Sequence, residues 1–385
     1  MSLWDELVGQ EAAIEAVRRA AEPGSDAMTH AWMIVGPAGS GRSTLAHAFA
    51  ATLVNEGDVD QTLRHVVSGS HPDVAVLATD RVSISIDEVR ELVTQSYYAP
   101  STARYRVIII EDADRMTERT SNVLLKALEE PPPRTVWILC APSVQDVLPT
   151  IQSRVRTITL RTPTVEQVAE LIVRRHAVDA DLATQAAREA QCHIGMAMRL
   201  ATDEEARSRR DHTVQTVLGL ETVSTAVKAA AELISLATAD QKALLEKLDA
   251  EEREETLRTL GVAPGAAVPA GLRGSVKALE ENQKRRATRS LRDGVDRVAT
   301  DITSVLRDVL MIQLQTGVEL VNERFRSGLE ERAAKTTAEH TLYAIDQIQV
   351  ARDRIAGNTP PQLALEAMLI AITGRIPMDL IEPRR

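Results

Sequence analysis

The sequence concentrates its candidate chemistry in a glycine-rich segment, residues 36–44 (GPAGSGRST), which separates an apolar run from a helical pattern. Such a loop turns its backbone N–H groups toward an anion, and the helix that follows adds a favourable dipole. The spacing matches G-x-x-x-x-G-K-[ST], in which Ser43 takes the position of a magnesium ligand. The segment therefore predicts a phosphate-binding loop. Its candidate nucleotide contacts are Gly36, Gly39, Gly41, Ser43 and Thr44.

The loop departs from that pattern at one position, where Arg42 replaces the lysine that reaches the phosphates. Arginine keeps the positive charge, but its planar fork is bulkier than an ammonium group. The chain contains 7 lysines and 38 arginines, so the replacement follows a bias of the whole sequence. The sequence leaves open whether ATP and magnesium bind at this degenerate loop.

A second candidate is the apolar run RVIII at 106–110, which ends in Glu111 and Asp112. A Walker B strand places an aspartate to hold magnesium and then a glutamate to polarise the attacking water. Here the order is reversed, so the longer side chain crowds the metal and the shorter one does not reach the water. An error of about 1 Å can cost roughly 100-fold in rate. Acids that only end a strand are the alternative interpretation of this pair.

A third candidate is the pair Ser153-Arg154, which precedes the last apolar run. An arginine supplied to a neighbouring subunit can stabilise the transition-state charge of its phosphates. By spacing alone, an ordinary surface arginine is favoured.

The elements around these residues follow from the periodicity of the first 160 residues. Helical patterns alternate there with short apolar runs, which indicates a parallel sheet covered on both faces. The predicted strands are AWMIV at 31–35, VAVL at 74–77, RVIII at 106–110, TVWILC at 135–140 and TITL at 157–160.

Residues 164–207 show three short helical segments, and the chain is helical from about 213 onward. A heptad-like stripe in that part predicts a core-facing helix of a bundle, although the spacing does not say whether it packs within or between subunits. The stripe consists of Leu291, Val295, Val298, Ile302, Val305 and Val309. Residues 261–275 contain four glycines and two prolines and are predicted to be a linker.

Composition limits the function classes. The chain has 385 residues and a formal net charge of −10, which argues against a protein that coats nucleic acid unaided. Its two cysteines, Cys140 and Cys192, fit a reducing compartment rather than a disulfide framework. The first residues lack the layout of a signal peptide and no apolar run is long enough to span a membrane, so a cytoplasmic location is expected.

Residues 98–160 resemble the ATPase module of bacterial clamp-loader subunits. The specific parts are LLKALEEPP at 124–132 and LPTIQSR at 148–154, and residues 358–366 resemble the end of that family's collar domain. The resemblance implies an α/β AAA+ P-loop domain over 1–162, a small helical lid domain over 163–212 and an all-α collar domain over 213–385.

Within that family the sequence is most similar to the delta-prime subunits of DNA polymerase III, because gamma/tau subunits keep the lysine and an Asp-Glu pair. The resemblance implies a stator that loads the sliding clamp (beta) onto primer–template DNA together with gamma/tau and delta subunits. Its own ATPase activity would be absent or weak. Arg154, with Ser153, would be an arginine finger that acts in trans. The alternative is an active AAA+ ATPase motor subunit.

The resemblance also implies roles for single residues. Val8 lies in the opening VGQ motif of the nucleotide site, and Arg199 stands where a second sensor arginine is expected. Ser101 and Arg104 would face the DNA backbone. Residues 54–72 lack the four zinc-binding cysteines usual in the family, so no zinc is expected.

Overall fold

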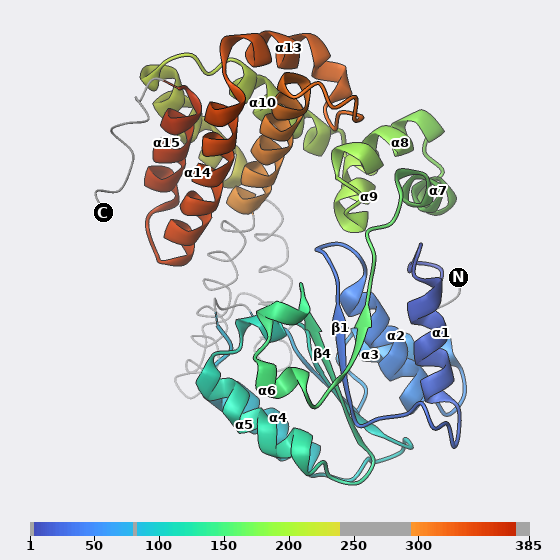
Figure 1. The fold of residues 1–385 in the computed structure, drawn as a ribbon. Coiled ribbons are helices and arrows are strands. Elements are labelled where there is room, and N and C mark those ends of the chain that lie inside the picture. Colours follow the sequence, from blue (N-terminus) through green and yellow to red (C-terminus); the bar gives the residue numbers. More distant parts are fainter. Residues whose placement is uncertain (1–3, 80–82, 239–293, 375–385) are drawn as a thin grey trace, which may run out of the picture. The chain divides into compact units, whose positions relative to one another are not determined.

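In the computed structural model of the chain, the residues described are 4–79, 83–238 and 294–374 (Figure 1). They form two compact units, which divide between Asp203 and Glu204. None of the helices within these ranges is both long and apolar enough to cross a membrane.

The first unit contains a five-stranded sheet with the order β2-β3-β4-β1-β5, in which all neighbouring strands are parallel. Its strands are β1 (Ala31–Val35), β2 (Val74–Leu77), β3 (Arg106–Ile110), β4 (Thr135–Ala141) and β5 (Arg156–Thr159). The predicted strands and their parallel arrangement are thus confirmed. The carboxyl ends of parallel strands meet at one edge of a sheet, which is where such folds bind ligands.

Helices cover both faces of this sheet (Figure 1). Strand side chains alternate between the faces, so Ile34 of β1 packs toward one helical layer and Met33 toward the other. The first layer is α1 (Glu11–Ala21), α2 (Arg42–Val54) and α3 (Val59–Val67). The second is α4 (Ile86–Ser96), α5 (Glu118–Glu129) and α6 (Pro149–Gln152), with the 3-10 turns η1 (Ala113–Arg115) and η2 (Val144–Asp146).

Three short helices complete the first unit, as the sequence predicts for the lid. They are α7 (Val165–His176), α8 (Ala180–Glu189) and α9 (Ile194–Thr202). A capping box starts α7, because Thr164 and Gln167 bond reciprocally to each other's backbone N–H groups. The compact first unit includes these helices, and the partition at residue 162 stays a prediction.

Within its described residues, the second unit consists of helices and the loops that connect them. Its elements are α10 (Glu204–Leu218), helical residues 223–238 and 294–313, η4 (Glu323–Phe325), α13 (Arg326–Lys335), α14 (Ala338–Ala356) and α15 (Pro361–Ile372). The second unit begins at Glu204, and α10 is continuous across residues 212 and 213. The boundary of a collar domain at 213 stays a prediction.

The predicted apolar stripe packs inside the second unit. Its members Val295, Val298, Ile302, Val305 and Val309 are all buried in the core of that unit. The stripe therefore serves packing within the chain, which the spacing alone left open. Leu291 and the linker at 261–275 lie outside the described residues.

Candidate nucleotide site and arginine edge

The glycine-rich loop lies between β1 and α2, at the carboxyl edge of the sheet. Gly39 and Gly41 have φ angles of 75° and 95°, a region that side-chain-bearing residues seldom adopt. These conformations turn the backbone into a cradle at the start of α2. The hydroxyl of Ser40 is buried there and makes no hydrogen bond within the described part of the chain. The backbone of the loop therefore fits a phosphate group.

The positively charged side chain of the loop, Arg42, contacts the protein backbone in this structure. Nη1 of Arg42 donates a hydrogen bond of 2.9 Å to the carbonyl oxygen of Gly36, at the start of the same loop. The guanidinium of Arg42 is bulkier than the ammonium group of the lysine that the pattern expects at this position. Ser43 and Thr44 lie half-buried in the first turn of α2. Ser43 and one of the acids that follow β3, Glu111 or Asp112, are the residues that would hold magnesium. These residues fit phosphate binding better than phosphate hydrolysis.

The lid packs directly on the loop through His193, the N-cap residue of α9. A Cβ added to Gly39 would lie 2.3 Å from Cγ of His193, and the N–H of Ile194 donates to the carbonyl oxygen of Gly39 at 3.4 Å. Gln191 and Cys192, just before His193, both have positive φ angles, of 51° and 62°. Two successive non-glycine residues in this region are uncommon, and they form the turn that leads into His193.

The two acids after β3 lie at the same edge as the loop. Burial and then Glu111 raise the pKa of the Cys140 thiol at the end of β4 to about 12, and the charge of Arg42 opposes that rise. Nε2 of His47 approaches Oε1 of Glu111 at 3.2 Å, while Asp112 lies 3.9 Å from Nε of Arg115. The structure thus brings the reversed pair together with Arg42, and it gives each acid a protein partner.

Ser153 and Arg154 follow α6 and lead into β5. Ser153 is exposed, and the Arg154 side chain retains 33% of its accessible surface. Nε and Nη2 of Arg154 donate to Oε1 of Glu129, the last residue of α5, and Nη1 donates to the carbonyl oxygen of Thr150 and to Oγ of Ser153. The arginine is therefore both near the surface and held in place.

The remaining predicted residues are spread over the first unit. Val8 is half-buried just before α1. Arg199 lies half-buried on α9, with its Nε 3.8 Å from Oδ2 of Asp203. Ser101 and Arg104 are exposed in the loop before β3, and the guanidinium of Arg104 stacks on the ring of Tyr105.

A buried carboxylate holds that loop in place. Asp73 is fully buried and accepts hydrogen bonds from the backbone N–H groups of residues 101–103 and from Nη2 of Arg106. Burial by itself raises the pKa of Asp73, but the bonds from Ala103, Ser101 and Thr102 outweigh it and lower the pKa to about 2. The exposed pair Ser101 and Arg104 therefore stands on a rigid base.

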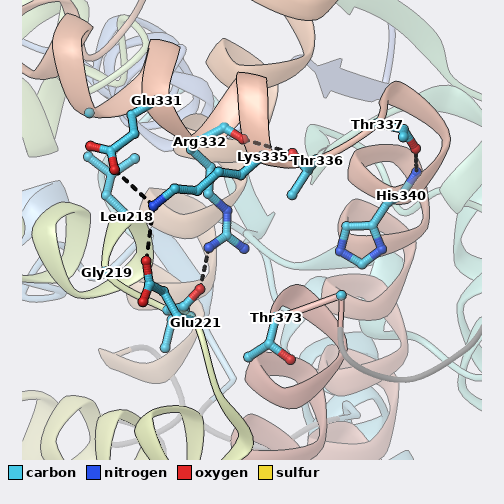
Figure 2. Close-up of a pocket in the computed structure, with 13 residues that line it drawn as sticks. Leu218, Gly219, Glu221, Glu331, Arg332, Lys335, Thr336, Thr337, His340 and Thr373 are labelled. Atoms are coloured by element: carbon cyan, nitrogen blue, oxygen red, sulfur yellow. Dashed lines mark hydrogen bonds and ion pairs between the residues drawn. The ribbon is translucent and has the colours of Figure 1, made fainter.

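A cavity of about 950 Å³ lies in the second unit, between the end of α10, α13 and the ends of α14 and α15 (Figure 2). Its charges are satisfied by the chain: Lys335 pairs with Glu221 at 3.0 Å and with Glu331 at 2.8 Å. Arg332 donates to the carbonyl oxygens of Leu220 and Ile372, and burial lowers its pKa. These contacts link α13 to the ends of α10 and α15. The charged residues of the cavity therefore hold these helices together.

The sequence analysis did not single out three residues that contact the predicted site residues. They are His47, Glu129 and His193. Glu129 stands inside the LLKALEEPP motif, so the motif could have drawn attention to it, but not to its partner Arg154. His47 and His193 carry no local signal, because their contacts join elements far apart in the sequence.

The parallel sheet and the glycine-rich loop at its carboxyl edge, between β1 and α2, define an α/β fold of the P-loop type. Residues 9–164 match the family described as "DNA polymerase III, delta subunit". This part of the chain is therefore similar to clamp-loader subunits of DNA polymerase III, among them gamma/tau and delta-prime subunits.

Two curated relatives illustrate the relationship. The "DNA polymerase III subunit gamma/tau" of Mycobacterium bovis is 32% identical over 157 residues, which are 39% of this chain and 27% of that protein. The "DNA polymerase III subunit delta'" of Pseudomonas aeruginosa is 34% identical over 134 residues, which are 32% of this chain and 41% of that protein. The match thus spans less than half the length of either relative.

Among solved structures, a gamma subunit-related protein of Thermotoga maritima aligns over 95% of this chain and 99% of its own. The sequence identity is 16% and the TM-score 0.46.

Proposed function

We propose that the chain is the delta-prime subunit of the DNA polymerase III clamp loader. In this role it is a stator that helps load the sliding clamp (beta) onto primer–template DNA in the cytoplasm. Its partners would be gamma/tau and delta subunits. The match of residues 9–164 to the family described as "DNA polymerase III, delta subunit" supports the complex. The contacts of Arg42 and Arg154 support the role within it.

The observation that carries the proposal is the hydrogen bond from Arg42 to the carbonyl oxygen of Gly36. It commits the loop's own cation to the protein, and Nε2 of His47 lies 3.2 Å from Oε1 of one catalytic acid, Glu111. A subunit whose loop cation is engaged in this way contributes little to hydrolysis of its own nucleotide. It can still act as a rigid partner.

In that role Arg154 would supply the chemistry. Its guanidinium would contact the phosphates of ATP bound by an adjacent gamma/tau subunit and stabilise the charge that develops during phosphoryl transfer. Ser153 accepts a hydrogen bond from Nη1 of Arg154 and so helps to orient the group.

The first experiment measures ATP binding and hydrolysis by the purified chain, beside an Arg42→Lys variant. We expect no turnover in either form, because the reversed acids limit catalysis even when a lysine restores the loop. Arg42→Lys should improve ATP binding, since a lysine would no longer fold back onto Gly36. Steady turnover by the unaltered chain would contradict the stator role.

Two observations favour the alternative of an active motor subunit. Gamma/tau relatives match about as well as the delta-prime relative, and the loop backbone with the unbonded Ser40 hydroxyl still fits a phosphate. For a motor subunit, hydrolysis by the isolated chain should disappear in Ser43→Ala, the variant that removes the magnesium ligand.

A further inference from the structure

We propose that Glu129 is a positioning residue that restrains Arg154 by competing with phosphate for its N–H donors. At rest the carboxylate holds the guanidinium against the end of α5, and the phosphates of a neighbouring subunit's ATP take its place. This inference rests on the proposed function, in which Arg154 acts in trans.

The geometry shows how completely the arginine is held. A guanidinium has five N–H donors. Arg154 uses four of them within its own chain: two toward Oε1 of Glu129, one toward the carbonyl of Thr150 and one toward Ser153. Arg154 therefore cannot make a bidentate contact with a phosphate through Nε and Nη2 until Glu129 gives up those donors.

The exchange is feasible because the pair lies near solvent. The Arg154 side chain is 33% exposed and that of Glu129 is 49% exposed. Exposed ion pairs of this kind contribute little to stability, so breaking this one leaves the fold intact. A phosphate offers the same planar fork a more highly charged, bidentate acceptor.

The position of Glu129 also favours a releasable contact. It is the last residue of α5, where the helix dipole presents partial negative charge. A carboxylate is disfavoured there unless a cation lies beside it, and Arg154 is that cation. The pairing thus orders two side chains that would otherwise sample several rotamers.

The first test measures how fast phenylglyoxal modifies Arg154 in the isolated full-length chain, read by mass spectrometry of the peptide that contains it. We expect Glu129→Gln to raise this rate about two- to fivefold, the range expected when an exposed ion pair is lost. Glu129→Asp should restore much of the protection. The matched control is Glu130→Gln, which changes the neighbouring exposed acid and should leave the rate unaltered.

The second test assembles the same variants with the gamma/tau and delta subunits and measures ATP hydrolysis. An internal competitor raises KM without changing kcat, so Glu129→Gln should lower the KM for ATP about two- to fivefold at constant kcat. A merely structural role would instead lower kcat or weaken assembly.

The two tests separate the two ideas. If Glu129→Gln leaves the modification rate of Arg154 unchanged, the restraint by Glu129 is wrong. If the rate rises but KM and kcat of the assembled complex stay the same, Glu129 restrains Arg154 as proposed. In that case the role of Arg154 toward a neighbour's ATP is what fails.

Discussion

Two arginine–carboxylate pairs in the first unit differ in their surroundings. Arg106 and Asp73 lie at the base of the loop that precedes β3, with side chains 9% and 0% exposed. Arg154 follows α6 and Glu129 is the last residue of α5, and their side chains are 33% and 49% exposed. Each pair consists of an arginine and an acid, but only the side chains of the second pair are substantially exposed to water.

The difference separates a structural contact from one that can exchange. Removing one partner of a buried pair leaves a charge with neither water nor a counter-ion. The exposed pair can be broken because water or another anion replaces the lost contact. We therefore expect the first pair to set stability and the second to set activity.

The largest expected effect is on activity. Arg154→Ala should lower ATP hydrolysis by the assembled clamp loader about 10³-fold, because it removes an arginine from the transition-state phosphates. Turnover of ATP by the reconstituted complex measures the change. Arg161→Ala, at an exposed arginine shortly after β5, is the control and should hydrolyse ATP normally. A loss of less than about tenfold in Arg154→Ala would argue against the finger role.

The next effect is on stability. Asp73→Ala should lower the free energy of unfolding of the first unit by about 3 kcal/mol. The change leaves the buried guanidinium of Arg106 without its carboxylate partner and three backbone N–H groups without an acceptor. Urea denaturation of the full chain, followed by far-UV circular dichroism, measures it.

The matched control for that change is Asp87→Ala, which breaks an exposed pair with Arg90 whose side chains are 91% and 65% exposed. It should change stability by less than about 0.5 kcal/mol. Equal losses in both variants would remove the distinction between buried and exposed pairs.

The pH dependence of stability sharpens the same distinction. The pKa of Asp73 is lowered from 3.8 to about 2 on folding, so its contribution is complete above pH 3.8 and is lost as the pH falls toward 2. The loss amounts to about 2 kcal/mol. Urea midpoints between pH 5 and pH 2 should fall less steeply in Asp73→Asn than in the unaltered chain, and parallel curves would contradict this assignment.

The smallest expected effect concerns the exposed pair. Glu129→Ala should lower the free energy of unfolding by less than about 1 kcal/mol, because solvent screens the contact with Arg154. Thermal unfolding at low and at 0.5 M salt measures this contribution, which added salt should reduce further. A loss as large as that of Asp73→Ala would make Glu129 a structural residue.

Much of the fold could be predicted from the sequence, because local spacing carries it. Alternating apolar runs predicted all five strands, and the glycine-rich pattern placed the loop at the start of α2. The apolar stripe after residue 294 predicted a buried helix, which packs within the second unit. The domain boundaries at 162 and 213 stay predictions, and no local break in α10 marks the second of them.

The candidate site could be predicted only in its parts. The sequence by itself determined which residue types stand at the strand ends. An arginine in place of a lysine and a reversed pair of acids stand at the carboxyl edge of the sheet, and an arginine stands just before β5, at the amino edge. The tertiary structure alone decided their partners, Gly36 for Arg42, His47 for Glu111 and Glu129 for Arg154. The physical reason is that a side chain's direction depends on the elements packed around it, and those elements come from distant parts of the chain.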